Sequence, residues 1–85
     1  MKYEVVFAAN VAKELRRIDR KWQLNIVAAG EALGDNPRPH SYKKFVDEGG
    51  LYRIKAGDYQ IIEEVQDRIL LVSILRIAKR NERTN

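Results

Sequence analysis

The spacing of apolar residues changes along the chain. In the first half it has the period of a helix, and in the second half apolar and β-branched residues form short runs of the kind found in strands. Ahead of the helical part, Tyr3 to Phe7 is rich in β-branched and aromatic residues and predicts a strand. Asn10 then stands where a helix N-cap is expected. Apolar residues follow at spacings of four, three and four, which predict one buried helical stripe: Val11, Leu15, Ile18 and Trp22.

A second helical series ends at Gly34, a natural C-terminal stop. Its apolar positions are Trp22, Ile26, Ala29 and Leu33. The first half is therefore expected to be a strand followed by a helical hairpin or one bent helix. The next segment, 36–50, holds both prolines and shows little periodicity, so we expect a loop that crosses the surface.

The second half reads as three strands joined by two tight turns. They are expected at 51–56, 59–65 and 69–77, with Gly57-Asp58 as a hairpin turn and another turn near Asp67. The last strand is apolar at nearly every position until Arg76, which is typical of a central strand covered on both faces, or by helices and a partner chain. The predicted class is α+β, with two N-terminal helices packed on a mostly antiparallel four-stranded sheet.

Length and composition limit the rest of the interpretation. A chain of 85 residues without cysteine is enough for one domain over 1–85 with no disulfide. The run Ile69 to Leu75 is far shorter than the roughly 20 apolar residues that cross a bilayer, and the first residues lack a signal-peptide pattern. We therefore expect a cytoplasmic protein that does not associate with membranes.

The net charge of +4 suits a polyanionic partner, although many proteins that bind no nucleic acid carry a similar charge. The surplus lies in two segments, with five basic and two acidic residues in 13–21 and four basic and one acidic in 76–85. The first segment predicts a basic helix face, which is either simply solvated or docks on nucleic acid. Its cations include Lys13, Arg16, Arg17 and Arg20.

Alternation along 51–56 places Arg53 and Lys55 on one face and Tyr52 and Ile54 on the other. If the second face meets the helices, the two cations project from the open face of the sheet, where the basic tail could join them. The alternative is that they only solvate the outer face of a half-buried strand.

Other catalytic arrangements find little support. Glu63 and Glu64 are adjacent in a strand, so alternation sends them to opposite faces and they cannot act as a carboxylate pair. His40 is the single histidine and has no ligand-spaced partner, and no glycine-rich phosphate loop is present. No metal and no cofactor are expected.

Several segments together resemble the RelE/ParE toxin superfamily. They are Tyr3 to Phe7 followed by Ala12-Lys13-Glu14-Leu15, the loop Asn36-Pro37-Arg38-Pro39 with Lys44-Phe45, and the block Leu51-Tyr52-Arg53-Ile54-Lys55-Ala56-Gly57-Asp58-Tyr59 running into Ile61-Ile62. An apolar strand and the basic pair Lys79-Arg80 complete the order. The resemblance spans nearly the whole chain.

The resemblance implies a type II toxin that enters the ribosomal A site, cuts mRNA there without a metal, and is silenced by a cognate RelB-like antitoxin in a hetero-oligomer. By position it implies three catalytic cations, Arg53, Lys55 and Arg80. The further RNA contacts expected are Lys79, Arg83, Gln60, Lys13, Arg16, Arg17 and Arg20. An amphipathic antitoxin segment is expected to fill an apolar groove between the helices and the sheet, or to add a strand at its edge.

The chain departs from the family pattern at several positions. Many relatives have an arginine in place of Gln60, a tyrosine in place of Glu63, and a tail tyrosine that this chain lacks. Gln60 donates a hydrogen bond but carries no charge, and Lys79 or Arg83 could replace the missing cation. Two other functions thus stay open, a ParE-like toxin that poisons DNA gyrase, and a non-catalytic member that binds only an antitoxin or RNA.

Overall fold

The strands form a single sheet that is larger than the sequence predicts. The computed structural model describes residues 2–40, 42–44 and 50–79, and in them the strand order is β1-β5-β4-β3-β2. The strands are β1 (Glu4–Phe7), β2 (Lys43–Lys44), β3 (Leu51–Ala56), β4 (Tyr59–Gln66) and β5 (Leu71–Lys79). A 3₁₀ turn, η1 (Asp67–Ile69), joins β4 to β5.

The three C-terminal strands form the predicted antiparallel meander, because each tight turn returns the chain beside the preceding strand. The prediction of a four-stranded, mostly antiparallel sheet needs correction in two respects. The sheet has five strands in the described part of the chain, and β1 pairs with β5 in parallel. Parallel neighbours need a long connection between them, here residues 8–70, so the pairing carries no local sequence signal.

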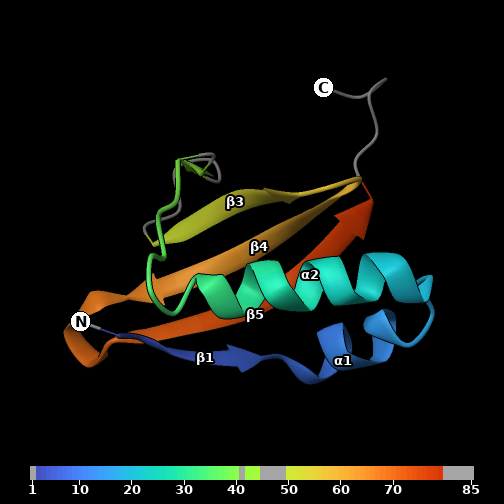
Figure 1. Cartoon of the computed structure of the whole chain (residues 1–85). Coiled ribbons are helices and arrows are strands. Elements are labelled where there is room, and N and C mark those ends of the chain that lie inside the picture. The colour runs from blue at the N-terminus through green and yellow to red at the C-terminus, as the bar shows by residue number, and fades with distance from the viewer. Residues whose placement is uncertain (1, 41, 45–49, 80–85) are drawn as a thin grey trace.

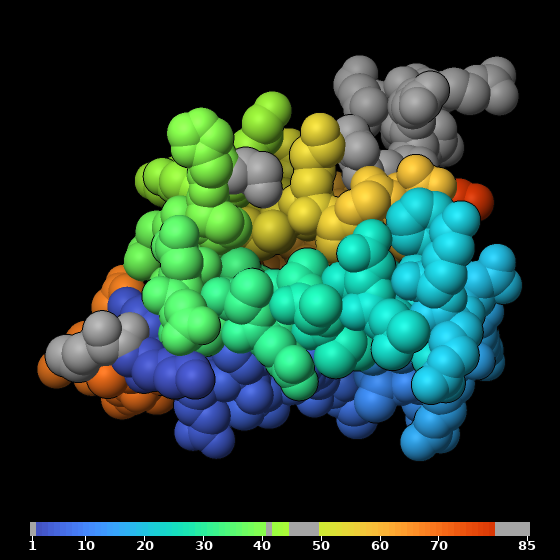
Figure 2. All heavy atoms as spheres, viewed as in Figure 1, coloured from blue at the N-terminus to red at the C-terminus, as the bar shows by residue number. Residues whose placement is uncertain are grey.

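Two helices, α1 (Ala9–Leu15) and α2 (Arg20–Ala32), lie on one face of the sheet (Figure 1). In the space-filling view from the same side, α2 runs across the middle of that face (Figure 2). The core lies between the two layers. Its fully or almost fully buried members include Val11, Ile26, Leu33, Ile54, Ile61, Val72 and Ile74.

β5 is a central strand, as predicted, because β1 and β4 flank it. Its helix-facing residues Val72 and Ile74 are fully buried, whereas Leu71, Ser73 and Leu75 are only half-buried. The expectation that the strand is covered on both faces is therefore only partly met. The apolar composition of β5 reflects its central position more than complete burial of both faces.

The predicted continuous stripe from Val11 to Trp22 is divided between the two helices. The chain turns at 16–19, where the side chain of Gln23 donates a hydrogen bond to the carbonyl of Leu15. The prediction of Asn10 as N-cap is wrong, since the helix begins at Ala9 with Ala8 in the cap position, and Asn10 lies inside its first turn. Asn10 instead donates a side-chain hydrogen bond to the carbonyl of Leu75 in β5. Neither described helix is long and apolar enough to cross a membrane.

The segment predicted as a loop contains the short strand β2, which pairs with β3. Both of its residues, Lys43 and Lys44, are exposed lysines, which are depleted in strands and give no strand signal in the sequence. Pairing with an existing sheet edge supplies the hydrogen bonds that composition does not predict. β2 therefore extends the sheet beyond β3 and adds a lysine to each of its faces.

Candidate nucleic-acid interface

β3 separates a buried face from a charged face. Tyr52 and Ile54 are buried beneath the helix layer, whereas Arg53 and Lys55 are exposed on the opposite side, which we call the open face. The alternation predicted from the sequence is confirmed. Two cations on the same side of one strand stand about 6.6–6.8 Å apart along it, close enough to act on one phosphodiester.

The strand register identifies what surrounds these cations. Lys55 pairs directly with Gln60, so both side chains lie on the open face. Arg53 pairs with Ile62, which in turn pairs with Arg76 of β5. Arg76 thus joins the open face, a role that the sequence alone did not suggest. The feature of the sequence that could have indicated this role is that Arg76 is the first charged residue in an otherwise apolar strand.

β2 contributes another cation that the sequence did not suggest. Lys43 pairs with Arg53 and therefore shares the open face, whereas Lys44 pairs with Tyr52 on the helix side. Neither assignment is available without the register of this two-residue strand. The open face thus carries Lys43, Arg53, Lys55 and Arg76, with Gln60 as a neutral hydrogen-bond donor beside Lys55.

Lys79, at the end of β5, occupies a different position. It pairs with Tyr59, which in turn pairs with Ala56, so the register places it on the side of the helix-facing residues. Its side chain is exposed at the sheet end. Arg80 and Arg83, which the resemblance implies as a catalytic and an RNA-contacting residue, lie outside the described residues.

A carboxylate is buried in the core. Glu63 is 0% exposed, and neither of its side-chain oxygens has a hydrogen-bond partner among the described residues. It pairs with Tyr52 and Ile74 on the helix face, while Glu64 pairs with Leu51 on the open face, so the predicted separation of the two carboxylates is confirmed. Burial raises the pKa of Glu63 to about 8, partly offset by the positive charge of Arg38.

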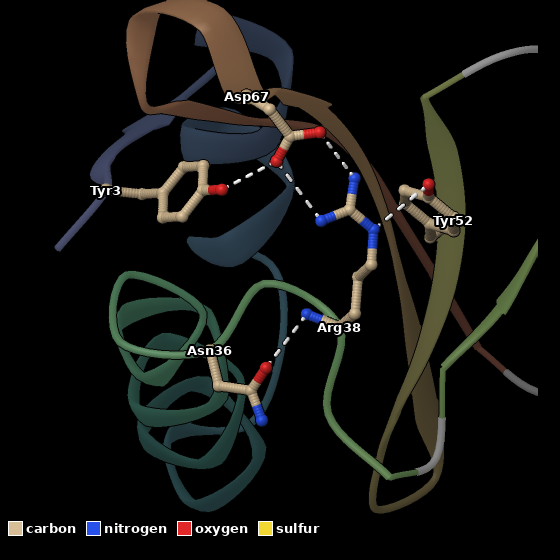
Figure 3. Close-up of polar contacts among 5 residues, drawn as sticks. All are labelled: Tyr3, Asn36, Arg38, Tyr52 and Asp67. Carbon is tan, nitrogen blue, oxygen red and sulfur yellow. Dashed lines mark hydrogen bonds and ion pairs between the residues drawn. The ribbon is translucent and has the colours of Figure 1, made fainter. Parts of the chain in front are cut away.

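Arg38 organises a polar cluster where the loop after α2 meets the sheet (Figure 3). Its guanidinium donates to both carboxylate oxygens of Asp67, at 2.8 and 3.2 Å, and its Nε donates to the Tyr52 hydroxyl at 3.1 Å. The Tyr3 hydroxyl donates to Asp67 at 2.6 Å. Hydrogen bonds from Arg38 and then Tyr3 lower the pKa of Asp67. The cluster ties together the residue before β1, η1, β3 and the loop, so Arg38 has a structural role.

The turn between β3 and β4 is held against α2. Gly57 has a φ of +65°, and a Cβ at this position would lie 2.5 Å from Cζ3 of Trp22. The Trp22 ring also packs against Tyr59, with centroids 6.1 Å apart. Lys55 and Gln60 form the second residue pair from this turn, so docking of the turn on Trp22 helps to position the backbone that carries both side chains.

We expect Gly57→Ala to lower the free energy of unfolding by about 1–3 kcal/mol, because alanine is strained at positive φ and its methyl group meets the indole. Urea unfolding measures the change. Gly50→Ala is a suitable comparison, since Gly50 also has a positive φ, of +80°, and a Cβ there would meet only the carbonyl oxygen of Val65 among the described residues. Equal losses in the two variants would show that Trp22 yields and does not fix the turn.

Comparison with known proteins identifies the family. The sequence model of the ParE toxin of type II toxin–antitoxin systems, parDE, matches residues 5–84. The chain belongs to the RelE/ParE toxin superfamily. No curated protein sequence matches the chain significantly.

Solved RelE structures have the same fold. A chain of the archaeal RelE–RelB complex from Pyrococcus horikoshii superposes with a TM-score of 0.85 at 25% identity, covering 96% of this chain and 99% of that chain. A chain of the RelBE2 complex from Mycobacterium tuberculosis gives 0.81 at 22% identity, covering 94% and 100%. A chain of the intact RelBE complex of E. coli superposes with a TM-score of 0.77 at 20% identity, covering 94% of this chain and 99% of that chain. At these identities the likeness concerns mainly the fold.

In this RelE/ParE toxin the basic residues of the helical region are separate from the open face. Their side chains are exposed on α1, on the turn after it, and at the start of α2: Lys13, Arg16, Arg17 and Arg20. They are carried by the helix layer, so they cannot contact the same phosphate as the cations of the open face. His40 is exposed in the loop, and no group of acidic or histidine side chains within the described residues could hold a metal ion.

The exposed apolar side chains of the described residues do not gather into the expected groove. The large apolar side chains that remain exposed are on four separate parts of the described chain: Val6, Leu24, Tyr42 and Ile69. They belong to β1, α2, the segment before β2, and η1. Among the described residues, core side chains fill the space between the helices and the sheet.

Proposed function

We propose that this protein is a ribosome-dependent mRNA endonuclease, the toxin of a type II toxin–antitoxin pair. The observation that supports this most directly is the exposure of Arg53 and Lys55, side by side on the open face of a RelE-like sheet. A gyrase poison on the same scaffold does not need paired cations at this position. Fold alone does not distinguish the two, because one scaffold can host different functions.

The proposed reaction needs only fixed positive charge and proton transfer. The 2′-oxygen of one ribose forms a bond to the neighbouring phosphorus, and the bond from phosphorus to the 5′-oxygen of the next nucleotide breaks. The products are a 2′,3′-cyclic phosphate and a 5′-hydroxyl, so the proton lost by the 2′-hydroxyl is balanced by one gained at the leaving oxygen. Negative charge grows on the phosphoryl oxygens, where Arg53 and Lys55 would stabilise it more than in the ground state.

Arg80 would be the third catalytic cation, following the resemblance. Lys79 and Arg83 would contact RNA from the chain end, and Gln60 would donate a hydrogen bond beside Lys55. The basic helical residues would dock the toxin on ribosomal RNA without contributing to the chemistry, because they are carried by the helix layer.

Docking by the helical cations has a measurable signature. We expect glutamate in place of Lys13, Arg16, Arg17 and Arg20 to weaken ribosome binding and to make it less dependent on salt. A toxin that makes fewer phosphate contacts releases fewer counterions when it binds. Sedimentation with ribosomes over a salt series measures both quantities. An unchanged affinity and slope would exclude these residues from the docking surface.

A RelB-like antitoxin is the proposed protein partner. Three of the structural relatives were solved as RelE–RelB or RelBE toxin–antitoxin complexes, and the matching family model describes a toxin of such a pair. The surplus of positive charge suits an acidic inhibitor segment. We expect the two proteins to form a hetero-oligomer that is inactive as a toxin.

Poisoning of DNA gyrase is the second candidate, because the matching family model is that of ParE. Mapping mRNA 5′ ends on translating ribosomes after induction of the toxin separates the two. Discrete cuts within the A-site codon are expected if the protein is an mRNA endonuclease. Intact mRNA with arrested replication would instead support the gyrase poison, and intact mRNA with normal replication a non-catalytic member.

A further inference from the structure

Three cations from three different strands stand in one line across the open face. Lys43 of β2 pairs with Arg53 of β3, Arg53 pairs with Ile62 of β4, and Ile62 pairs with Arg76 of β5. Directly paired residues point to the same face of a sheet. We call Lys43, Arg53 and Arg76 the cation row.

The dimensions of a sheet determine the spacing of this row. Neighbouring strands lie about 4.8 Å apart, so Lys43 is next to Arg53, while Arg53 and Arg76 are separated by two strand spacings, about 10 Å. The row therefore crosses the strands at a right angle and extends over roughly 14 Å. This is a line of charge, in contrast to the single pair that alternation along β3 provides.

The cation row is exposed and free of ion pairs within the described part of the chain. All three side chains are classed as exposed. The two ion pairs formed there join other residues, Lys2 with Asp35 and Arg38 with Asp67. Cations that stabilise the fold are usually held by a carboxylate, as Arg38 is, so the row is better placed to bind an external anion.

Arg76 also lies next to the position where the site lacks a charge. Gln60 pairs with Ala78, two residues along β5 from Arg76, so Gln60 and Arg76 are diagonal neighbours. Diagonal Cα atoms are about 7–8 Å apart, within reach of a long side chain. The guanidinium of Arg76 can therefore approach a phosphate that Gln60 contacts only through a neutral hydrogen bond.

We propose that Arg76 is a phosphate-binding residue, and that the cation row binds the phosphates of one RNA strand that crosses β2, β3, β4 and β5. The proposal rests on the proposed function in taking RNA as the ligand. A single line of cations matches the single phosphate backbone of an unpaired strand, which a positively charged surface can follow without reading its sequence. Glu64 lies on the same face, two residues along β4 from Ile62, and its negative charge would repel an RNA phosphate on that side of the row.

The test measures RNA binding without ribosomes. A fluorescent single-stranded RNA with 2′-O-methyl riboses cannot be cleaved, and its anisotropy reports binding to the full-length protein over a salt series. Arg76→Ala is expected to weaken binding roughly tenfold and to reduce the salt slope by about 0.7. Lys43→Ala should act in the same direction, and Arg76→Lys should retain most of the slope because it retains the charge.

Arg68→Ala is the matched control, since Arg68 is an exposed arginine on η1, away from the row. It should bind RNA like the parent. The proposal is overturned if Arg76→Ala binds like Arg68→Ala, if the parent binds no RNA at low salt, or if duplex RNA of equal length binds as tightly as the single strand. Absence of cleavage on ribosomes would overturn the proposed function alone, because this experiment does not depend on cleavage.

Discussion

Cleavage of mRNA on the ribosome is expected to fall by at least about two orders of magnitude in the double variant Arg53→Ala and Lys55→Ala. Both cations are exposed on one strand, where they would face the negative charge that develops on the phosphoryl oxygens. Exposed side chains of this kind add little to stability, so the free energy of unfolding should change by no more than about 0.5 kcal/mol. Primer extension on mRNA from purified translating ribosomes measures the rate.

Two further variants make this result specific. Arg68→Ala removes an exposed arginine from η1 and should cleave like the parent. Arg53→Lys keeps the charge but loses the planar fork of donors, so it should recover only part of the activity. Adding Arg80→Ala tests the residue that the family resemblance implies. If the double variant cuts at the parental rate, the open face is not the catalytic site.

Replacing Glu63 with glutamine should make the protein's stability much less dependent on pH. Glu63 is fully buried without a hydrogen-bond partner in the described residues, and its pKa in the folded protein is about 8, against an ordinary value of 4.5 in a solvated chain. Between these two values the unfolded chain releases a proton that the folded protein keeps. Stability therefore falls as the pH rises through this window, and the loss is complete above about pH 8.

The expected slope is up to about 1.4 kcal/mol for each pH unit, which amounts to a difference on the order of 3 kcal/mol at pH 7. Urea unfolding of the parent and of Glu63→Gln between pH 5 and 8 measures it. Glu64→Gln is the matched control, because this neighbouring carboxylate lies on the half-exposed opposite face and should leave the slope unchanged. If the free energy of unfolding of Glu63→Gln depends on pH as steeply as that of the parent, Glu63 is ionised or has a hydrogen-bond partner in the folded protein.

Glu63→Met should complement this result. Methionine is similar in size to glutamate and carries no polar oxygen, so it removes the cost of burying an unpartnered carboxyl while filling the same space between Tyr52 and Ile74. We therefore expect it to stabilise the protein at neutral pH more than glutamine, which still buries an amide.

Local patterns were sufficient to predict much of the second half of the chain. Alternation along 51–56 and the Gly57-Asp58 turn predicted β3, the hairpin and the outward direction of Arg53 and Lys55. Each of these depends only on residues close in sequence, because the strand period and the turn conformation are local properties. The two helices were predicted on similar grounds, but their division at 16–19 was not, since the apolar spacing continues across it.

Pairing between distant segments was not predictable in this way. β1 lies beside β5 in parallel, and β2 is a strand only because β3 offers an edge to it. Asn10 has the composition of a helix cap but binds the carbonyl of Leu75. Likewise, the sequence showed that Glu63 and Glu64 face opposite ways but not that Glu63 is sealed in the core without a partner.

The sequence by itself thus determined most of the elements, the direction of side chains within the predicted strands, and the resemblance to the family. The tertiary structure alone decided which side chains from different elements stand together: the line of Lys43, Arg53 and Arg76 on the open face, and the linkage of Arg38 to Asp67. The physical reason is that periodicity acts over a few residues, whereas register is set by the packing of the entire sheet. A shift of one residue in the register of a strand would send the cation on that strand to the opposite face.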